Sequence, residues 1–362
     1  MNSTIVHINF AKTWRGGERQ VVLLYSELRK LNIKQKLFCR KGSSLHKYCV
    51  EHDFDFESFS TVSSFLLAPF LLSLYRLKGP LIVHCHESKG QTVGVLGRFF
   101  SMKKIPVIVH RRVLFPIKQK FTTNIKYSRH NIEKIICISK AVENVVKDCI
   151  GFPATAVVPS CASFEIVNQN DVNIRSKYNI NPNCKLVGYI AALTFEKDHS
   201  TFLKTAVEIK KQIENVHFLI VGSGPTKNKL INQVTRLGIE DSVTFTGFLK
   251  NPERIISQID VLLFTSRSEG LGSTILDFFV YKKPVVSVRN GGAEEIIINE
   301  KTGLLSPVGD YKKLADQVMH LLSDSSFVKN LTDNAYEYVR KHHSPKKVAL
   351  LTLGIYKELL DG

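Results

Sequence analysis

The chain has 362 residues, of which 44% are hydrophobic and 23% are charged, and its formal net charge is +18. This length exceeds what one hydrophobic core usually supports, so two domains are expected, and the composition is that of a globular rather than a disordered or fibrous protein. The longest apolar segment, 65–77, contains Pro69 and Arg76 and is shorter than the roughly 20 residues that span a bilayer, so it predicts a buried or interfacial helix.

The amino-terminal residues and the cysteines indicate a reducing compartment. The first apolar run, 5–10, is interrupted by His7 and Asn9, which is typical of a strand rather than a secretion signal. Seven cysteines are scattered without a C-x-x-C pair, a pattern that predicts neither zinc nor disulfides. We therefore expect a cytoplasmic protein without a structural metal.

The positive charge is concentrated in the first half. Residues 1–165 hold 25 Lys/Arg against 11 Asp/Glu, and the segment 98–147 is the most basic. Such a field attracts anionic lipid or a phosphorylated acceptor, although a plain solvated basic surface has the same composition. The segment shows no helix-turn-helix, RNA-binding-sheet or zinc-finger pattern, so nucleic acid is not an expected partner.

Short β-branched runs alternate with helical patterns in both halves, which predicts two α/β domains with parallel sheets and helices on both faces. The strands are expected at 5–9, 36–39, 81–84, 107–110, 134–138 and 156–158, and then at 185–190, 216–221, 243–246, 261–264 and 285–288. A polar segment, 159–182, is expected to link the halves, and 344–360 has a helical pattern. The predicted domains are 1–165 and 166–343, followed by a helix over 344–362.

Candidate ligand-binding residues of the first half follow its strands, where open α/β sheets place their ligands. Gly16 and Gly17 come after the first strand and would let a backbone approach a ligand closely, or form a plain strand-to-helix turn. His86 follows the strand at 81–84, and His110 ends the next one, just before Arg111 and Arg112. Histidines in such places are either reactive groups or buried structural ones.

The most informative segment is 266–284, which follows a buried strand. Glu269 begins a glycine-rich loop after the strand, and Ser273 or Thr274 is the expected N-cap of the helix that follows. Asp277, in the first turns of that helix, is expected to point back toward the pocket that Glu269 lines. The unpaired N–H groups and the positive dipole end of a helix start favour binding of a diphosphate. The two carboxylates could accept hydrogen bonds from sugar hydroxyls. The alternative is an ordinary helix start with turn glycines.

Further loops of this kind follow the other strands of the second half. Lys197 comes after the strand at 185–190, Gly222 and Gly224 after the next, and Gly247 and Phe248 after the third. Each of these loops is a common turn when taken alone, but their order along the chain favours a phosphate-binding domain.

Together these motifs resemble the retaining glycosyltransferases of the family 4 type, whose signature is Glu-x7-Glu. Asp277 replaces the second Glu, Ala192 stands where Arg is usual, and Cys161 replaces a usual Gly. The form Lys197-Asp198-His199 resembles a branch associated with lipopolysaccharide and cell-surface glycans. The resemblance implies the GT-B fold, in which two Rossmann-like domains face a central cleft and a C-terminal helix returns to the first domain.

The resemblance also implies roles for the candidate residues. His110, Lys197 and Glu269 would be catalytic, and His86, Arg111 and Arg112 would lie on the acceptor side. The residues expected to bind the donor are Gly16, Gly17, Gly222, Gly224, Gly247, Phe248, Gly270, Leu271, Gly272, Ser273, Thr274 and Asp277. The expected donor is a UDP- or GDP-sugar and the acceptor a glycan or glycolipid, with no cofactor or metal, at the inner face of the cytoplasmic membrane.

Two other functions share this architecture. A sugar-nucleotide epimerase would need no acceptor, and a non-catalytic binding protein would have lost the chemistry. NAD-linked chemistry is disfavoured because the first loop does not spell Gly-x-Gly-x-x-Gly. Asp53-Phe54-Asp55 spells the Asp-x-Asp of metal-dependent transferases, but its alternating context favours surface acids.

Overall fold

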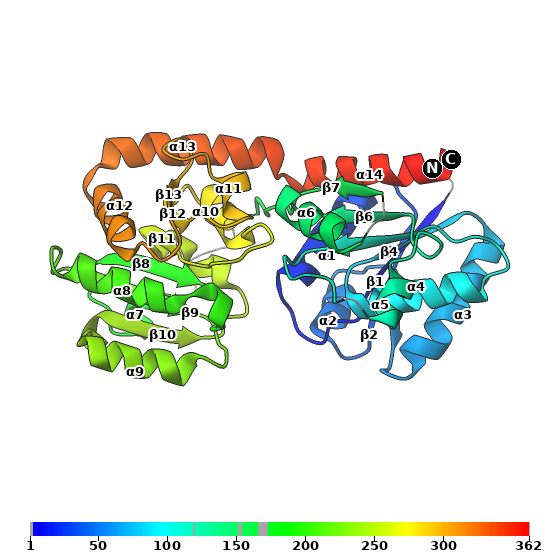
Figure 1. Ribbon diagram of the computed structural model, residues 1–362, viewed down its shortest axis with the longest axis horizontal. Helices are drawn as coiled ribbons and strands as arrows, with labels where there is room; N and C mark the ends of the chain where they lie inside the picture. Colours follow the sequence, from blue (N-terminus) through cyan, green and yellow to red (C-terminus); the bar gives the residue numbers. More distant parts are fainter. Residues whose placement is uncertain (1–2, 119, 151–153, 166–172, 362) are drawn as a thin grey trace. The chain divides into compact units, whose positions relative to one another are not determined.

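The structure is a computed structural model that describes residues 3–118, 120–150, 154–165 and 173–361. It contains two compact units, one of residues 1–161 with 345–362 and one of residues 162–344. Both are layered α/β structures (Figure 1). Among the helices of the described residues, none combines the length and the hydropathy needed to cross a bilayer.

The described part of the first unit contains a seven-stranded parallel sheet of order β3-β2-β1-β4-β5-β6-β7. Its strands are β1 (Thr4–Asn9), β2 (Gln35–Arg40), β3 (Phe56–Phe59), β4 (Leu81–Cys85), β5 (Val107–Arg111), β6 (Lys134–Cys137) and β7 (Thr155–Val157). Its helices are α1 (Gly16–Lys30), α2 (Ser44–Glu51), α3 (Ser63–Lys78), α4 (Ser88–Phe100), α5 (Phe121–Lys126), α6 (Lys140–Cys149) and α14 (Pro345–Asp361).

The two faces of this sheet bury alternate residues. Ile82 and Ile108 pack in one core with Leu24 of α1 and Tyr356 of α14. On the opposite face, Val83, Cys85 and Val107 lie against Gly94 of α4. Right-handed crossovers account for this division, because the chain runs one way from β1 to β3 and the other way from β3 to β7.

The expected return of the C-terminal helix to the first domain is confirmed. Val348, Ala349 and Tyr356 of α14 are buried in the core of the first unit, and the Tyr356 hydroxyl lies 2.6 Å from Nδ1 of His84. The first unit ends at Cys161, before the expected boundary at residue 165. The expected linker, 159–182, includes residues 166–172, which lie outside the described residues.

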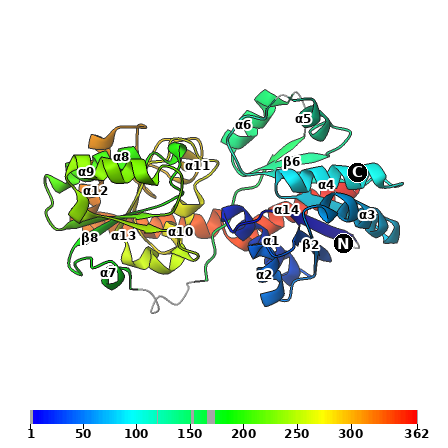
Figure 2. The same ribbon diagram turned by 90° about the horizontal axis from the view of Figure 1, so that it is seen from below.

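The second unit has a parallel sheet of order β10-β9-β8-β11-β12-β13 among its described residues. Its strands are β8 (Lys185–Ile190), β9 (Val216–Val221), β10 (Val243–Gly247), β11 (Val261–Phe264), β12 (Val285–Val288) and β13 (Leu304–Ser306). Its α-helices are α7 (Ile174–Lys177), α8 (His199–Lys210), α9 (Lys227–Leu237), α10 (Ser273–Val280), α11 (Ala293–Ile296), α12 (Tyr311–Ser323) and α13 (Ser325–His342). Its 3-10 helices are η1 (Phe195–Lys197), η2 (Glu240–Ser242) and η3 (Pro252–Gln258). Figure 2 shows α8 and α9 on one side of this sheet and α10 on the opposite side.

Three sequence-based expectations need correction. Strands β3 and β13 were not expected, because both are short edge strands with little sequence pattern. The expected N-cap at Ser273 or Thr274 is wrong, because Gly272 caps α10 with a φ of 88°, a left-handed conformation that glycine adopts without strain. The apolar helix expected at 65–77 exists as α3, but it buries few of its large side chains.

Candidate functional site

In each sheet, the strand order reverses at one point. The reversal lies between β8 and β11 in the second unit and between β1 and β4 in the first. Ligands of open α/β sheets bind beyond the carboxyl ends of the strands at such a point. The residues that follow these four strands therefore define the candidate site of each unit.

In the second unit, Lys197 and Glu269 meet beyond the ends of β8 and β11. Lys197 Nζ lies 2.5 Å from Glu269 Oε1, and the two side chains are 22% and 13% exposed. Both therefore reach solvent while they neutralise each other. The sequence predicted each residue separately, but not their pairing.

Hydrogen bonds hold the two loops that carry this pair together. Thr265 Oγ1 donates to the Asp198 carbonyl at 3.0 Å, and the Arg267 N–H donates to the Glu196 carbonyl at 2.8 Å. The buried Tyr189 hydroxyl donates to the Lys197 carbonyl at 2.8 Å. These three hydrogen bonds therefore hold in place the backbone of the loops that carry the ion pair.

Arg267 is a basic residue of this site that the sequence did not single out. Its Nε donates to Asp198 Oδ2 at 2.7 Å, and its guanidinium lies 5.7 Å from the ring centre of Phe195. Asp198 is buried and caps α8 with a φ of 46°, so it is a structural anchor rather than a ligand-binding acid. Arg267 is 47% exposed and adds a second basic side chain two residues before Glu269 in the chain.

The start of α10 completes the site of the second unit. Among the described residues, no hydrogen bond is donated by the backbone N–H groups of Gly272, Ser273 and Thr274. Thr274 Oγ1 donates to the Ile190 carbonyl at 3.4 Å, which places this helix start at the end of β8. Asp277 is half-buried one turn further along the helix. The helix start thus presents free donors and its positive dipole end, which together bind anions.

The predicted glycine loops serve backbone packing. A Cβ on Gly222 would lie 1.9 Å from the Ala191 carbonyl oxygen, and one on Gly224 would lie 2.2 Å from the Leu193 carbonyl oxygen. Gly222 also donates its N–H to the Gly247 carbonyl at 2.9 Å. These glycines hold three loops in register, and Phe248 beside them is 63% exposed. Whether they also contact the donor stays a prediction.

In the first unit, four histidines gather at the reversal point. His7 of β1 is the register partner of His84 of β4, and the sequence analysis did not single out either as a site residue. His86 follows β4 and His110 lies near the end of β5. The rings of His84 and His110 are stacked with centres 5.4 Å apart. All four side chains are buried.

Two of these histidines, His86 and His7, form a hydrogen-bonded chain with Arg112 and Gln35 whose direction can be assigned. Arg112 can only donate, so Nδ1 of His86, at 3.1 Å, accepts. Nε2 of His86 then carries a proton and donates to Nδ1 of His7 at 2.9 Å, and Nε2 of His7 donates to Gln35 Oε1 at 3.2 Å. Both rings are thereby fixed as neutral tautomers.

The positive charge of Arg112 and burial oppose protonation of this cluster. Burial lowers the pKa of His7 to about 4, although its hydrogen bond to Gln35 acts in the opposite sense. Burial first, and nearby positive groups second, hold the pKa values of His84, His86 and His110 well below the usual range. The cluster is therefore uncharged at neutral pH.

His7, His84 and His86 also present ring nitrogens that lie within 4.8 Å of one another, a spacing that a metal ion could use. Two of these residues are already committed to the chain from Arg112 to Gln35. A cation would also have to bind beside the Arg112 guanidinium. The donor set therefore fits a hydrogen-bonded network better than a metal centre.

The other predicted residues of the first unit occupy distinct places. Gly16 and Gly17 form the first turn of α1, and a Cβ on Gly17 would meet nothing within 4 Å. Arg111 is half-buried and donates to the Phe115 carbonyl. His86 and Arg112 are committed to each other, whereas both ring nitrogens of His110 have no partner among the described residues. Of the predicted histidines, His110 is thus the one with free hydrogen-bonding capacity.

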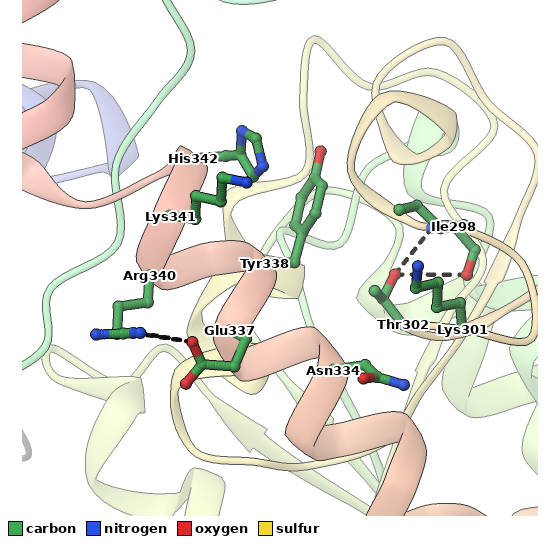
Figure 3. A pocket seen from close by; sticks show the side chains of 9 residues that line it. All are labelled: Ile298, Lys301, Thr302, Asn334, Glu337, Tyr338, Arg340, Lys341 and His342. Carbon is green, nitrogen blue, oxygen red and sulfur yellow. Dashed lines mark hydrogen bonds and ion pairs between the residues drawn. The ribbon is translucent and has the colours of Figure 1, made fainter.

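A separate hollow of about 600 Å³ lies between α13 and the loop before β13 in the second unit (Figure 3). None of the predicted site residues lines it. Figure 3 shows Thr302 bonded to the backbone of Ile298 and Glu337 paired with Arg340, so these polar groups already have partners.

Comparisons with known proteins agree with this arrangement. Residues 14–162 match the family model "Glycosyltransferase Family 4", and residues 170–338 match "Glycosyl transferases group 1". An alpha-D-kanosaminyltransferase of Streptomyces kanamyceticus is 25% identical over 80% of this chain and 73% of its own length. The lipopolysaccharide core biosynthesis glycosyltransferase LpsD of Rhizobium meliloti is 22% identical over 97% of both chains.

A similar fold occurs in the solved structure of Alr3699/HepE from Anabaena in complex with UDP-glucose. The TM-score is 0.83 at 18% identity, over 98% of this chain and 99% of that one. At this identity the likeness shows the fold alone, and that fold is GT-B, with two Rossmann-like parallel-sheet domains. The two family models together cover most of the chain and show that it belongs to the glycosyltransferases that combine a family 4 domain with a group 1 domain.

Proposed function

We propose that this glycosyltransferase moves a sugar, with retention of its anomeric configuration, from a UDP- or GDP-sugar to a glycan or glycolipid acceptor. The observation that carries the proposal is the Lys197–Glu269 pair beside the unpaired N–H groups at the start of α10. UDP is the first donor nucleotide to test, because the structural neighbour from Anabaena was solved with UDP-glucose.

The charge distribution of the second unit supports binding of a diphosphate. Lys197 donates one N–H to Glu269 and has two others for phosphate oxygens. Arg267 supplies the basic side chain that Ala192 lacks, and the α10 dipole adds positive potential. Glu269 then holds Lys197 in place and has a second oxygen for a hydroxyl of the donor sugar.

In the reaction that we propose, the bond between C1 of the donor sugar and the diphosphate oxygen breaks as negative charge grows on the diphosphate. Lys197 and the amides at 270–274 stabilise that charge because they are fixed before the reaction. The acceptor hydroxyl oxygen bonds to C1 from the same face, and its proton passes to the departing diphosphate. Asp277 is assigned to the ribose hydroxyls and His110 to the sugar–phosphate region.

The remaining features of the proposal concern the acceptor and the metal. Relatives named for lipopolysaccharide core biosynthesis and capsular polysaccharide biosynthesis support a cell-surface glycan or glycolipid acceptor. The proposed catalysis uses protein cations in place of a metal, and association with the inner face of the membrane follows from a glycolipid acceptor.

Thermal unfolding of the protein with UDP, GDP and ADP, each with and without its common sugars, tests the proposal. A ligand at 100 times its Kd stabilises by about 2.7 kcal/mol, which raises the midpoint by several degrees. The expected result is a rise with one nucleotide class, followed by transfer to an acceptor extract with retained configuration in the NMR spectrum of the product. A rise without transfer would favour a binding protein, and turnover without an acceptor would favour an epimerase.

A further inference from the structure

Helix α3 exposes most of its large apolar side chains and buries mainly small residues. Its buried positions are Ser64, Ala68, Pro69 and Leu72, so mostly small residues face the unit. Its exposed apolar side chains, which we call the α3 apolar face, are Phe65, Leu66, Leu67, Phe70, Leu74 and Leu77, with exposures from 36% to 68%. Contiguous exposed apolar surface of this kind marks an interaction site.

The end of α4 extends this surface. Phe99, Phe100 and Met102 are 80%, 58% and 94% exposed. Arg76 Nε, near the end of α3, donates to the Lys104 carbonyl at 2.9 Å, which brings the ends of the two helices together. Figures 1 and 2 both show α3 beside α4 at the edge of the first unit.

Basic residues outnumber acidic residues around the surface. Between residues 57 and 133 the sequence has 12 Lys/Arg and three acids, Glu57, Glu87 and Glu133. Glu57 accepts a hydrogen bond from Tyr75, and Glu133 pairs with Arg98 and Lys104. The carboxylate of Glu87 is used to cap α4, where it accepts from the N–H groups of Lys89 and Gly90. Lys78, Lys103 and Lys104 are exposed beside the apolar side chains of both helix ends.

We propose that the α3 apolar face and the end of α4 form a docking surface for an anionic lipid bilayer. Apolar side chains on a helix enter the interfacial region while adjacent lysines contact the anionic headgroups. Charge complementarity selects this occupant over a second copy of the chain, because two copies of a surface with this charge repel each other.

The surface also leads to the candidate site of the first unit. Helix α4 begins at Ser88, two residues after His86, and Lys89 Nζ lies 4.8 Å from the centre of the Phe65 ring on α3. The docking surface therefore reaches the histidine end of the sheet, and this step rests on the proposed glycolipid acceptor. A bound bilayer would supply such an acceptor at that end.

Co-sedimentation of the full chain with vesicles tests the proposal. Vesicles of phosphatidylcholine with 30% phosphatidylglycerol are compared with pure phosphatidylcholine at about 50 and 500 mM NaCl. The expected result is binding to the anionic vesicles that weakens at high salt, because the distance beyond which exposed charges are screened falls from about 14 Å at about 50 mM to about 4 Å at about 500 mM. The proposal would be overturned if the protein sedimented equally with both kinds of vesicle, or if it sedimented with neither kind.

Two pairs of variants locate the surface. Phe99→Ser/Phe100→Ser is expected to weaken vesicle binding by about tenfold or more, whereas Phe195→Ser, 76% exposed in the second unit, leaves it unchanged. Lys78→Glu/Lys103→Glu is expected to remove the preference for anionic lipid, and Lys312→Glu/Lys313→Glu on α12, with the same change in net charge, is its control.

Each variant is checked by thermal unfolding, and light scattering measures its oligomeric state. The unaltered protein could instead self-associate and fail to bind vesicles. If Leu66→Ser/Phe70→Ser then abolished this self-association, a second copy of the chain would cover the α3 apolar face, and the proposal would be overturned. The nucleotide-dependent shift of the unfolding midpoint is independent of vesicles. If the unaltered protein shows this shift but does not bind vesicles, the docking surface alone is refuted; if it binds vesicles but shows no shift with any nucleotide, the proposed function alone is refuted.

Discussion

Lys197 and Glu269 are 72 positions apart in the chain, and their side chains meet with Nζ and Oε1 2.5 Å apart. One follows β8 and the other follows β11, the two strands on either side of the point where the strand order reverses. In the proposed reaction, the cation that stabilises the leaving diphosphate needs a fixed position, and the Glu269 carboxylate would hold Lys197 in it. The pair therefore explains how a protein with Ala192 in place of the usual Arg can still present an oriented positive charge.

Replacement of Lys197 by Met is expected to lower kcat by about 100-fold or more with a smaller change in KM, because the partner charge grows in the transition state. Lys229→Met, an exposed lysine of α9 in the same unit, is the matched control and is expected to retain kcat. Steady-state kinetics with the donor that gives the thermal shift measures both constants.

The double variant Lys197→Met/Glu269→Gln separates two roles of Lys197. If Lys197 only neutralised Glu269, removal of both charges would restore turnover. We expect the double variant to remain as inactive as Lys197→Met, and recovery of kcat would contradict a role at the diphosphate.

The free energy of unfolding is expected to fall as the pH falls from about 6.5 towards 4. The pKa of His7 is about 4 in the folded protein against 6.5 as its ordinary value, so between these values the unfolded state binds a proton that the folded state does not. Each such histidine contributes up to about 1.4 kcal/mol per pH unit in this window. His84, His86 and His110 act in the same sense.

Urea unfolding at pH 7, 6, 5.5 and 5 measures this slope. His7→Gln is expected to reduce the slope by about one proton. A stability that stays constant from pH 7 to pH 5 would contradict the neutral cluster.

Gly222→Ala is expected to destabilise the second unit by about 3 kcal/mol or more, because its Cβ would lie 1.9 Å from the Ala191 carbonyl oxygen and its φ is +150°. Gly354→Ala in α14 is the control: its Cβ would meet nothing within 4 Å, and it is expected to stabilise by up to about 1 kcal/mol. Thermal unfolding of the two variants compares the effects, and equal midpoints would contradict the packing role of Gly222.

Activity is expected to be unchanged in excess EDTA and in Asp53→Asn/Asp55→Asn. Asp55 pairs with Lys36 at 2.8 Å and Asp53 is exposed near Arg29, so the Asp-x-Asp sequence is engaged in surface ion pairs. EDTA saturated with calcium is the control for effects of the chelator itself. Loss of turnover that Mg²⁺ or Mn²⁺ restores would show that the protein uses a metal.

The sequence by itself determined the elements that local pattern encodes. Continuous apolar runs such as 261–264 mark strands buried on both faces, and the glycine-rich loop after Glu269 marks a helix start, because both depend on residues that are neighbours in the chain. The short edge strands β3 and β13 carry too little pattern for this reasoning.

Only the tertiary structure decided which distant residues meet. His7 lies in the first strand, and its place in the chain from Arg112 to Gln35 follows from the pairing of β1 with β4, which no local pattern records. In α3 the apolar sequence indicated burial, yet its buried positions are mostly small residues, and the buried Leu72 lies against Gly97 of α4. Which face of a helix is buried depends on the shape of its neighbour, and that shape arises only when the chain has folded.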